Sequence, residues 1–496
     1  MATPDQVIIF GASGDLTSRK LIPALLNNHI AGALKRPIQV IGVARSTKTH
    51  EQWRQEMGEA LAPELREAYA SFSSQLYWVR ANAADSNDLH ELGEFLDRLT
   101  EEAGGTPDQA GRLFYLALGP NLFGRVVSAL SSQNLIDSEP GATDGWRRVV
   151  VEKPFGTDLP SAQALNRTLL QHLREDQLFR IDHYLGKETV QNILSFRFQN
   201  AIFEPLWNRQ HIESVEISVC EKVAMEGERG AYYDKAGALR DMVQNHLLQV
   251  LALVAMEAPG TLSADDVRNE KTKVFRALRR FTANEVKNRV IRAQYIQGPG
   301  RERDYREEPG VDPESQTETY VAIRAAIDNW RWSEVPFLLR TGKALEKRFT
   351  QIVLNFRTPP VDLLNGPLPE GVCALRPNAL TLRIQPDEGV SWSFLVKEPG
   401  AGMVMRQADL GFRYADLGVP KIPDAYQRLL LDALEGNATL FLRGDEVEAA
   451  WSFVDAIHAG WAEGNAPIWT YPAGGRGPDE ADALFVGCEG IWSRGP

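Results

Sequence analysis

The chain has 496 residues and a formal net charge of −12, with 43% hydrophobic and 24% charged residues. This length exceeds one ordinary hydrophobic core, so we expect two domains, and the composition is that of a globular enzyme. The acidic balance argues against partners such as nucleic acid or an anionic membrane surface, since both require a dense positive face. If the ligands are phosphates, the chain must gather its cations locally.

The three cysteines, Cys220, Cys373 and Cys488, lie far apart in the sequence. This spacing argues against a disulfide framework and the usual zinc sites, and we expect no metal ion. We expect no secretory signal, because no basic residues precede the first apolar run at residues 7–10. The longest apolar run, near residues 247–256, is about half of a membrane span. These features predict a cytoplasmic protein.

Residues 1–180 alternate short β-branched runs with helical patterns. This alternation predicts an α/β, Rossmann-like dinucleotide-binding domain, with a parallel sheet covered by helices on both faces. The strand candidates are residues 7–10, 38–43, 76–79, 113–117 and 149–152, and the helical stretches between them include residues 21–26, 89–99 and 122–130.

A glycine-rich turn follows the first strand candidate, with the sequence Gly11-Ala12-Ser13-Gly14-Asp15-Leu16. Glycines at such a turn let the backbone approach a pyrophosphate, which lies at a helix N-terminus where free N–H groups favour an anion. The motif alone is weak, but its position between the first strand and the first helix favours a dinucleotide site. A glycine turn without a ligand is the alternative.

The second strand candidate ends in Gly42-Val43-Ala44-Arg45-Ser46, without the Asp or Glu that usually holds the ribose of NAD. Arg45 can instead pair with a 2′-phosphate through two charge-assisted hydrogen bonds. An arginine at a strand end is also a common surface residue. The position of Arg45 therefore favours NADP over NAD without proving it.

The densest polar cluster of the chain is the segment Arg180-Ile181-Asp182-His183-Tyr184-Leu185-Gly186-Lys187, and a helix is predicted to start at its end. In a helical turn His183 and Lys187 would face the same way, since they are four residues apart. A cation, an imidazole and a phenol together suit a phosphate monoester. The alternative is a capped, solvated start of a helix.

A second cluster, Arg240-Asp241-Met242-Val243-Gln244-Asn245-His246, lies in an apolar helical pattern. A histidine in such a pattern is usually a hydrogen-bonded core residue. Dehydrogenation of a hydroxyl, however, needs a base for the O–H proton, and imidazole has a suitable pKa of about 6.5. A carboxylate on its far nitrogen would fix the tautomer. Spacing leaves Asp182 and Asp241 both open for that task, although Asp241 is a poor helical match.

Beyond residue 180 the pattern changes to closely spaced strands with few helices between them. Residues 181–496 are therefore expected to form a domain of α+β type, with a large, mainly antiparallel sheet. The helix candidates are residues 188–198 and 239–256, the strand candidates are residues 215–220, 290–295, 320–327, 337–341, 351–356, 379–384 and 392–395, and residues 298–317 are predicted to be an exposed loop.

These fragments together resemble the glucose-6-phosphate dehydrogenase family, in order and over nearly the whole chain. The RIDHYLGK segment is highly specific, whereas the glycine turn is not. The resemblance is carried by GASGDL, VARS around Arg45, Glu152-Lys153-Pro154-Phe155-Gly156, RIDHYLGKETVQNIL, Trp207-Asn208-Arg209, RDMVQNHLLQ, Leu339-Arg340-Thr341-Gly342-Lys343-Ala344-Leu345 and Pro423-Asp424-Ala425-Tyr426.

The resemblance implies oxidation of glucose 6-phosphate at C1 to 6-phosphogluconolactone, with hydride transfer to NADP, as the first step of the oxidative pentose phosphate pathway. His246 would be the base and Asp182 its orienting partner. The implied substrate-binding residues are Lys153, His183, Tyr184, Lys187, Glu221, Asp241, Lys343, Arg348 and Gln385, and the implied NADP-binding residues are Gly11, Ser13, Gly14, Asp15, Leu16, Lys20, Arg45 and Lys153.

Within this resemblance, His183, Tyr184 and Lys187 would hold the phosphate, and Glu221 and Asp241 would bond sugar hydroxyls. Lys347 is adjacent to Arg348, and either could contact the substrate. The resemblance also implies that residues 181–496 bind the substrate and mediate oligomerisation, in a homodimer or a homotetramer.

Other functions follow from other interpretations of the same residues. An NADP-sensing regulatory protein would keep the glycine turn but would need neither His246 nor Lys153. A dehydrogenase of an unphosphorylated sugar or a hydroxy acid would leave His183 and Lys187 without a partner. For a structural protein, the acidic surface and the glycine-rich loops are neutral evidence.

Overall fold

A computed structural model describes residues 3–225, 227–359, 361, 378–418, 422–463, 466–485, 492, 493 and 495. The chain forms two compact units. Unit 1 contains residues 1–187, 260–268 and 423–448, and unit 2 contains residues 188–259, 269–422 and 449–496. Cys373 and Cys488 lie outside the described residues, and Cys220 is a buried free thiol.

Unit 1 is built on a seven-stranded sheet with the order β15-β6-β5-β4-β1-β2-β3. The strands from β1 to β6 pair in parallel, and β15 pairs with β6 in the antiparallel direction. The strands are β1 (Asp5–Phe10), β2 (Ile38–Ala44), β3 (Leu76–Arg80), β4 (Arg112–Leu116), β5 (Arg147–Val151), β6 (Leu178–Ile181) and β15 (Phe441–Leu442).

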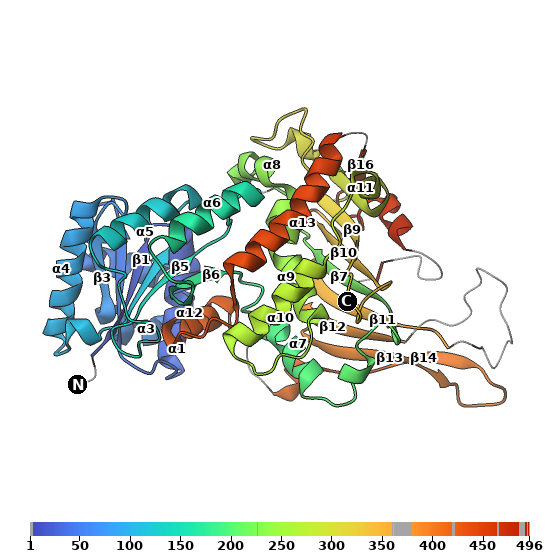
Figure 1. The fold of residues 1–496 in the computed structure, drawn as a ribbon, viewed down its shortest axis with the longest axis horizontal. Helices are drawn as coiled ribbons and strands as arrows, with labels where there is room; N and C mark the ends of the chain where they lie inside the picture. The colour runs from blue at the N-terminus through green and yellow to red at the C-terminus, as the bar shows by residue number, and fades with distance from the viewer. Residues whose placement is uncertain are drawn as a thin grey trace. The chain divides into compact units, whose positions relative to one another are not determined.

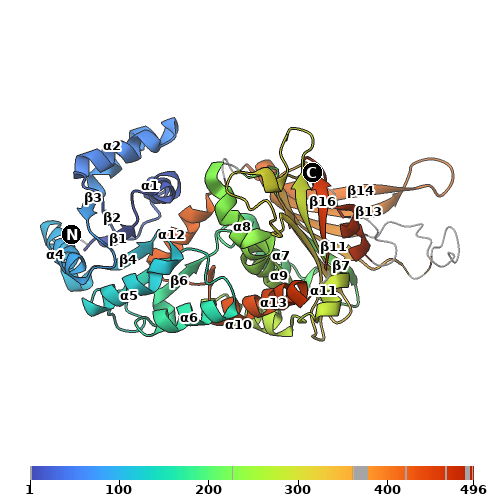
Figure 2. The ribbon, with the colours of Figure 1, turned by 90° about the horizontal axis from the view of Figure 1, so that it is seen from above.

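Helices cover both faces of this sheet. Figures 1 and 2 show α5 and α6 on one face and α1 and α12 on the other. Every residue of β1 and β4 is buried, as expected of strands packed on both sides. The helices of unit 1 are α1 (Ile22–Ile30), α2 (His50–Ala60), α3 (Arg66–Phe72), α4 (Ser86–Glu102), α5 (Phe123–Ser132), α6 (Leu159–Leu170) and α12 (Ala425–Glu435).

A late part of the chain completes unit 1. Phe441 of β15 pairs with Ile181 of β6, and its ring lies 4.8 Å from that of Phe179. The Asn28 amide of α1 donates to the Gln427 carbonyl of α12 at 2.8 Å. The sequence predicts a single domain boundary near residue 180, whereas unit 1 also includes residues 260–268 and 423–448.

Unit 2 contains a nine-stranded sheet with the order β14-β13-β12-β11-β7-β10-β9-β8-β16. Its neighbouring strands are antiparallel except for the pairs β7–β10 and β8–β16. The strands are β7 (Ile212–Cys220), β8 (Val290–Ile296), β9 (Tyr320–Ala326), β10 (Pro336–Gly342), β11 (Phe349–Phe356), β12 (Ala379–Gln385), β13 (Gly389–Lys397), β14 (Met405–Arg413) and β16 (Ile468–Pro472). The predicted fold class, α/β followed by α+β with a mainly antiparallel sheet, is confirmed.

The helices after residue 187, apart from α12, include a long apolar helix, as predicted for residues 239–256. It consists of a π-helical segment, η9 (Leu239–Leu247), that continues directly into α9 (Leu248–Ala255). The other helices are α7 (Glu188–Phe198), α8 (Gly230–Ala238), α10 (Ala264–Ala277), α11 (Ala283–Arg289) and α13 (Gly444–Glu463), and a boundary between the units falls within α10 and within α13.

The prediction of an exposed loop at residues 298–317 is wrong for the middle of that segment. Tyr305 is only 1% exposed, and its hydroxyl donates to Asp234 Oδ1 at 2.9 Å. The Glu308 carboxylate is also buried and accepts a hydrogen bond from the Tyr295 hydroxyl. The segment is rich in Gly and Pro, but its aromatic and acidic side chains anchor it to α8 and β8.

Among the described residues, no helix combines the length and the apolar character that a membrane span requires.

Candidate active site

The glycine turn of unit 1 lies at the carboxyl end of β1. Gly11 has a φ of +81°, and a Cβ atom on it would lie 2.2 Å from the carbonyl oxygen of Ala117. The Gly14 N–H closes the turn on the Gly11 carbonyl at 2.9 Å. Ser13, Gly14 and Asp15 are exposed, and the chain then enters the helical segment η1 (Thr17–Leu21) and α1. Only a residue without a side chain therefore fits at position 11, as in the tight turns of dinucleotide-binding motifs.

Two cations are predicted to bind the cofactor, Arg45 after β2 and Lys20 in η1. Arg45 is exposed and follows β2 directly, as a residue that reads a 2′-phosphate requires. Lys20 follows the glycine turn, and its Nζ lies 2.8 Å from Asp424 Oδ2. The sequence analysis does not predict this ion pair, which joins η1 to the residue that caps α12.

Lys153 lies just after β5, next to the buried carboxylate of Glu152. Glu152 Oε1 accepts hydrogen bonds from the hydroxyls of Tyr115 and of Tyr426, the latter at 3.2 Å. Burial raises the pKa of Glu152, although both tyrosines and Lys153 act in the opposite direction. The two tyrosines thus fix the residue that precedes Lys153.

The RIDHYLGK segment begins with the last two residues of β6 and continues as a turn after Asp182, and α7 begins at Glu188, directly after the segment as predicted. Asp182 is 1% exposed, and its Oδ1 accepts the Tyr184 N–H at 2.9 Å. The His183 ring meets that of Tyr184 edge-on at 5.1 Å, and Lys187 Nζ lies 4.1 Å from the centre of the same ring. The prediction of a shared helical face for His183 and Lys187 is wrong, but Tyr184 contacts both.

Glu221 and Lys343 come together in unit 2, where Lys343 Nζ lies 2.6 Å from Glu221 Oε2. The backbone adds to this contact, because the Glu221 N–H donates to the Gly342 carbonyl at 2.9 Å. Lys343 Nζ also lies 5.0 Å from the centre of the Tyr233 ring. Parallel pairing of β7 with β10 places the ends of the two strands side by side, which explains the contact.

Tyr233 of α8 contacts Lys343, and the sequence does not predict this contact. Its ring is buried, and burial together with the charges of Asp241, Glu318 and Glu221 raises its pKa well above the ordinary value. The charges of Asp241 and Glu221 therefore act on the same ring that Lys343 contacts. A tyrosine in a Gly-Ala-Tyr-Tyr-Asp run is an ordinary helical residue in sequence, so no pattern indicates this contact.

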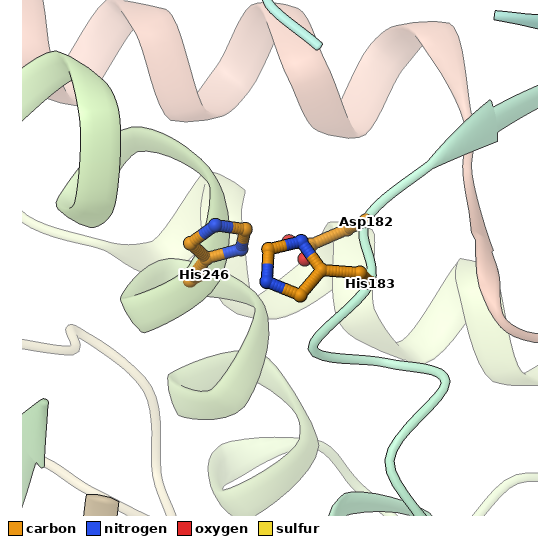
Figure 3. Close-up of side chains that lie close together, drawn as sticks. All are labelled: Asp182, His183 and His246. Atoms are coloured by element: carbon orange, nitrogen blue, oxygen red, sulfur yellow. The ribbon is translucent and has the colours of Figure 1, made fainter. Parts of the chain in front are cut away.

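His246 and Asp241 both lie on η9. His246 is 1% exposed, and its backbone N–H donates to Asn245 Oδ1 at 2.7 Å, whereas Asp241 is half-buried. Figure 3 shows the imidazole of His246 on this helix, and the side chains of Asp182 and His183 on the segment that follows β6.

The remaining predicted residues lie at strand ends of unit 2. Gln385 ends β12, and its Nε2 donates to Thr350 Oγ1 at 3.1 Å. Arg348 is exposed and precedes β11, and its neighbour Lys347 is exposed as well. Nothing in their burial distinguishes Arg348 from Lys347.

The chain was compared with protein families, with curated proteins and with solved structures. The model described as glucose-6-phosphate dehydrogenase, NAD binding domain, matches residues 8–192, and the model of the C-terminal domain matches residues 194–493. Glucose-6-phosphate 1-dehydrogenase of Aggregatibacter actinomycetemcomitans is 44% identical over 98% of this chain and 97% of the relative. The same enzyme of Bacillus subtilis is 40% identical over 97% of this chain and 96% of the relative.

Solved structures give the same result. A structure of glucose-6-phosphate dehydrogenase in complex with its substrate glucose-6-phosphate matches with a TM-score of 0.87 and 34% identity, and covers 97% of this chain and 98% of the other. Glucose-6-phosphate 1-dehydrogenase from Mycobacterium avium matches with a TM-score of 0.82 and 33% identity, over 99% of this chain and 100% of the other. The chain belongs to the glucose-6-phosphate dehydrogenase family.

Proposed function

We propose that this chain oxidises glucose 6-phosphate at C1 to 6-phosphogluconolactone, with NADP as the hydride acceptor, in the first step of the oxidative pentose phosphate pathway. The observation that carries the proposal is the full-length similarity to relatives with this activity, at 40–44% identity. The chemical residues of the family motifs are all present, including His246, Asp182 and Lys187.

His246 is the proposed general base, which takes the proton of the C1 hydroxyl as the C1–H bond breaks. Asp182 is the proposed partner that orients the imidazole and stabilises the imidazolium that forms. Both side chains are buried, which supports these roles. Buried side chains are held in place, so the carboxylate and the imidazole need little rearrangement during the reaction. Asp182 is already held through its bond from the Tyr184 N–H.

His183, Tyr184 and Lys187 are the proposed phosphate ligands. Their side chains gather within one turn of unit 1, with Tyr184 in contact with the other two. A phosphate monoester accepts hydrogen bonds from a phenol and from an imidazole, and an ammonium supplies the charge. An unphosphorylated sugar would leave this cluster without a ligand.

The sugar hydroxyls are proposed to contact the acidic and amide side chains of unit 2 together with nearby cations. The Glu221–Lys343 pair presents an acceptor and a donor at one point, and both side chains are partly exposed. The full proposed set is Lys153, Glu221, Asp241, Lys343, Arg348 and Gln385, with Lys347 as the alternative to Arg348.

NADP is proposed as the cofactor, and when bound it accepts the hydride from C1. The glycine cradle, with Gly11, Ser13, Gly14, Asp15 and Leu16, is proposed to hold the pyrophosphate. Arg45 is proposed to read the 2′-phosphate. Lys20 and Lys153 are proposed to complete the cofactor site. The exposure of Arg45 after β2 supports this assignment.

We also propose that residues 1–180 carry cofactor binding and that residues 181–496 carry substrate binding and oligomerisation, in a cytoplasmic homodimer or homotetramer. The outer strands β13 and β14 support oligomerisation, because their apolar side chains at Val396 and Leu410 are exposed. The buried thiol of Cys220 is compatible with a reducing compartment. Light scattering on the purified protein measures the oligomeric state.

Steady-state kinetics with two substrates and two cofactors test the proposed function. Formation of the reduced cofactor is followed with glucose 6-phosphate or glucose, each with NADP or NAD. The proposal predicts the highest kcat/KM for glucose 6-phosphate with NADP. An equal kcat/KM for glucose would contradict the proposed phosphate site. The absence of turnover with every combination of sugar and dinucleotide would contradict the proposed function.

A further inference from the structure

The carboxylate of Glu318 lies at the N-terminal end of η9. Its Oε1 accepts the backbone N–H of Leu239, the first residue of that helix, at 2.8 Å, and its carbonyl oxygen accepts the N–H of Ala238 at 3.0 Å. Glu318 is only 4% exposed and is separated from β9 by Thr319 alone. A residue that is distant in sequence therefore caps the helix that carries Asp241 and His246.

Gly237 makes room for this contact. It has a φ of +70° and forms a kink between α8 and η9. A Cβ atom at this position would lie 2.5 Å from Glu318 Oε1. The first N–H groups of a helix have no partner within the helix, and an anion there is favoured by the helix dipole. The kink at Gly237 thus leaves room for the Glu318 carboxylate, which accepts the hydrogen bond of the Leu239 N–H.

The residue after Glu318 is bonded to Lys343. The Lys343 N–H donates to the Thr319 carbonyl at 3.0 Å, and the Tyr471 hydroxyl lies 3.0 Å from Thr319 Oγ1. The same Tyr471 hydroxyl donates to the Lys343 carbonyl at 2.7 Å. Two consecutive residues therefore connect η9 on one side with the backbone of Lys343 on the other.

We propose that Glu318 is a positioning residue for the oxidation of glucose 6-phosphate, an inference that rests on the proposed function. Glu318 fixes the start of η9, and with it the places of Asp241 and His246, relative to Lys343. It touches neither substrate nor cofactor. Its contribution is to hold residues of one substrate site in register within unit 2.

The ionised carboxylate of Glu318 lowers the stability of the folded protein, because the side chain is buried. Burial raises the pKa of Glu318 to about 7, and Arg240 on η9 and Arg292 on β8 act in the opposite direction. Tyr233 on α8 and Tyr305 in the loop after β8 also face the carboxylate, and its charge raises their pKa values. Because the pKa is raised in the folded state, stability falls as the pH rises from the ordinary glutamate value to about 7. Above about pH 7, the Glu318→Gln variant will therefore be at least as stable to unfolding as the parent protein.

Three substitutions separate the contact from the charge. Glu318→Gln keeps the length and an acceptor for the Leu239 N–H, Glu318→Asp keeps the charge but is too short to reach it, and Glu318→Ala removes both. Glu216→Ala is the matched control, because Glu216 is a buried carboxylate of β7 that binds Ser493 and Asn355 instead of η9.

The first measurement is kcat with saturating glucose 6-phosphate and NADP, with KM for NADP and the thermal midpoint recorded alongside. The inference predicts a loss of kcat of at least about tenfold for Glu318→Ala and Glu318→Asp, which corresponds to about 1.4 kcal/mol in the barrier. Glu318→Gln stays close to the parent enzyme in kcat, and above pH 7 its thermal midpoint is not lower. KM for NADP is unchanged in all variants. A kcat for Glu318→Ala equal to that of Glu216→Ala would overturn the inference.

The second measurement does not depend on turnover. Amide hydrogen exchange in the intact protein is compared at residues 238–247 and 342–345. Glu318→Ala and Glu318→Asp will accelerate exchange in both segments, whereas Glu216→Ala and Glu318→Gln will not. Unchanged exchange in Glu318→Asp would contradict the coupling even if an alanine variant failed to fold. If the parent protein exchanged as expected but did not oxidise glucose 6-phosphate, the proposed function alone would fail.

Discussion

Lys343 Nζ lies 2.6 Å from Glu221 Oε2, so two residues that the family resemblance predicts for the substrate site form an ion pair. Lys343 is held on three sides, by this carboxylate, by the Tyr233 ring and by the backbone bond to Thr319. The pair keeps an ammonium in a fixed place at the ends of β7 and β10. Its orientation is therefore expected to depend on Glu221.

Removal of the Glu221 charge tests this dependence. Glu221→Gln will raise KM for glucose 6-phosphate by roughly tenfold, because a bond to a charged group is worth roughly 1.5–3 kcal/mol and the amide retains part of it. KM for NADP will change little. Glu213→Gln, which removes the partner of Arg357 on the surface, is the control and will leave both constants unchanged. Equal KM values for Glu221→Gln and the control would show that the pair does not serve the substrate.

The glycine turn is expected to be intolerant of a single methyl group. Gly11→Ala will weaken NADP binding and lower the thermal midpoint, because the new Cβ would lie 2.2 Å from the Ala117 carbonyl oxygen. Gly32→Ala is the control, since Gly32 has a φ of +62° but no atom within 4 Å of the added Cβ. It will show only the backbone penalty of about 1–2 kcal/mol. Titration with NADP measures the affinity of each variant, and thermal unfolding measures its midpoint. Equal affinities and equal midpoints for Gly11→Ala and Gly32→Ala would contradict the close approach at Gly11.

Lys187 is expected to act on the sugar phosphate and not on the cofactor. Lys187→Ala will raise KM for glucose 6-phosphate by about one to two decades, as expected from a lost charge-assisted contact of roughly 1.5–3 kcal/mol. Lys35→Ala removes an exposed lysine that pairs with Glu435 and serves as the control. Parallel increases in KM for the sugar phosphate and for NADP would count against the assignment.

Arg45 is expected to set the choice between the two dinucleotides. Arg45→Ala will narrow the ratio of kcat/KM with NADP to that with NAD, because the 2′-phosphate loses its charge partner while the ribose of NAD loses little. Arg80→Ala is matched to it, since Arg80 is an exposed arginine at the end of the neighbouring strand β3. If the ratio stays the same in Arg45→Ala, another group reads the 2′-phosphate.

Local pattern predicts most of the strands and some of the helices. The strands near residues 7–10 and 38–43 and the helix at residues 188–198 are found where β-branched runs and helical periodicity predict them. The short strand β6 was missed, because four buried residues after a turn give no periodicity. The exposed strand β14 was missed for a related reason, since its two faces carry no alternation of apolar and polar residues.

The long-range contacts could not be read from the sequence. The return of β15 and α12 to unit 1 depends on the pairing of Phe441 with Ile181, which lies far outside any local window. The candidate site residues were predicted from motifs, but their contact partners were not. Asp424 beside Lys20 and Tyr233 beside Lys343 give no local signal, because each contact joins segments that only the fold brings together.

The most direct test of the catalytic assignment is the turnover of His246→Asn, measured together with its Kd for glucose 6-phosphate. The amide cannot take up the C1 hydroxyl proton, so we predict a fall in kcat of about two to four decades, the usual contribution of a general base. The Kd will stay near that of the parent enzyme and of His90→Asn, which changes an exposed histidine of α4. Turnover of His246→Asn at the parent rate, with normal binding, would contradict the role of His246 as the base.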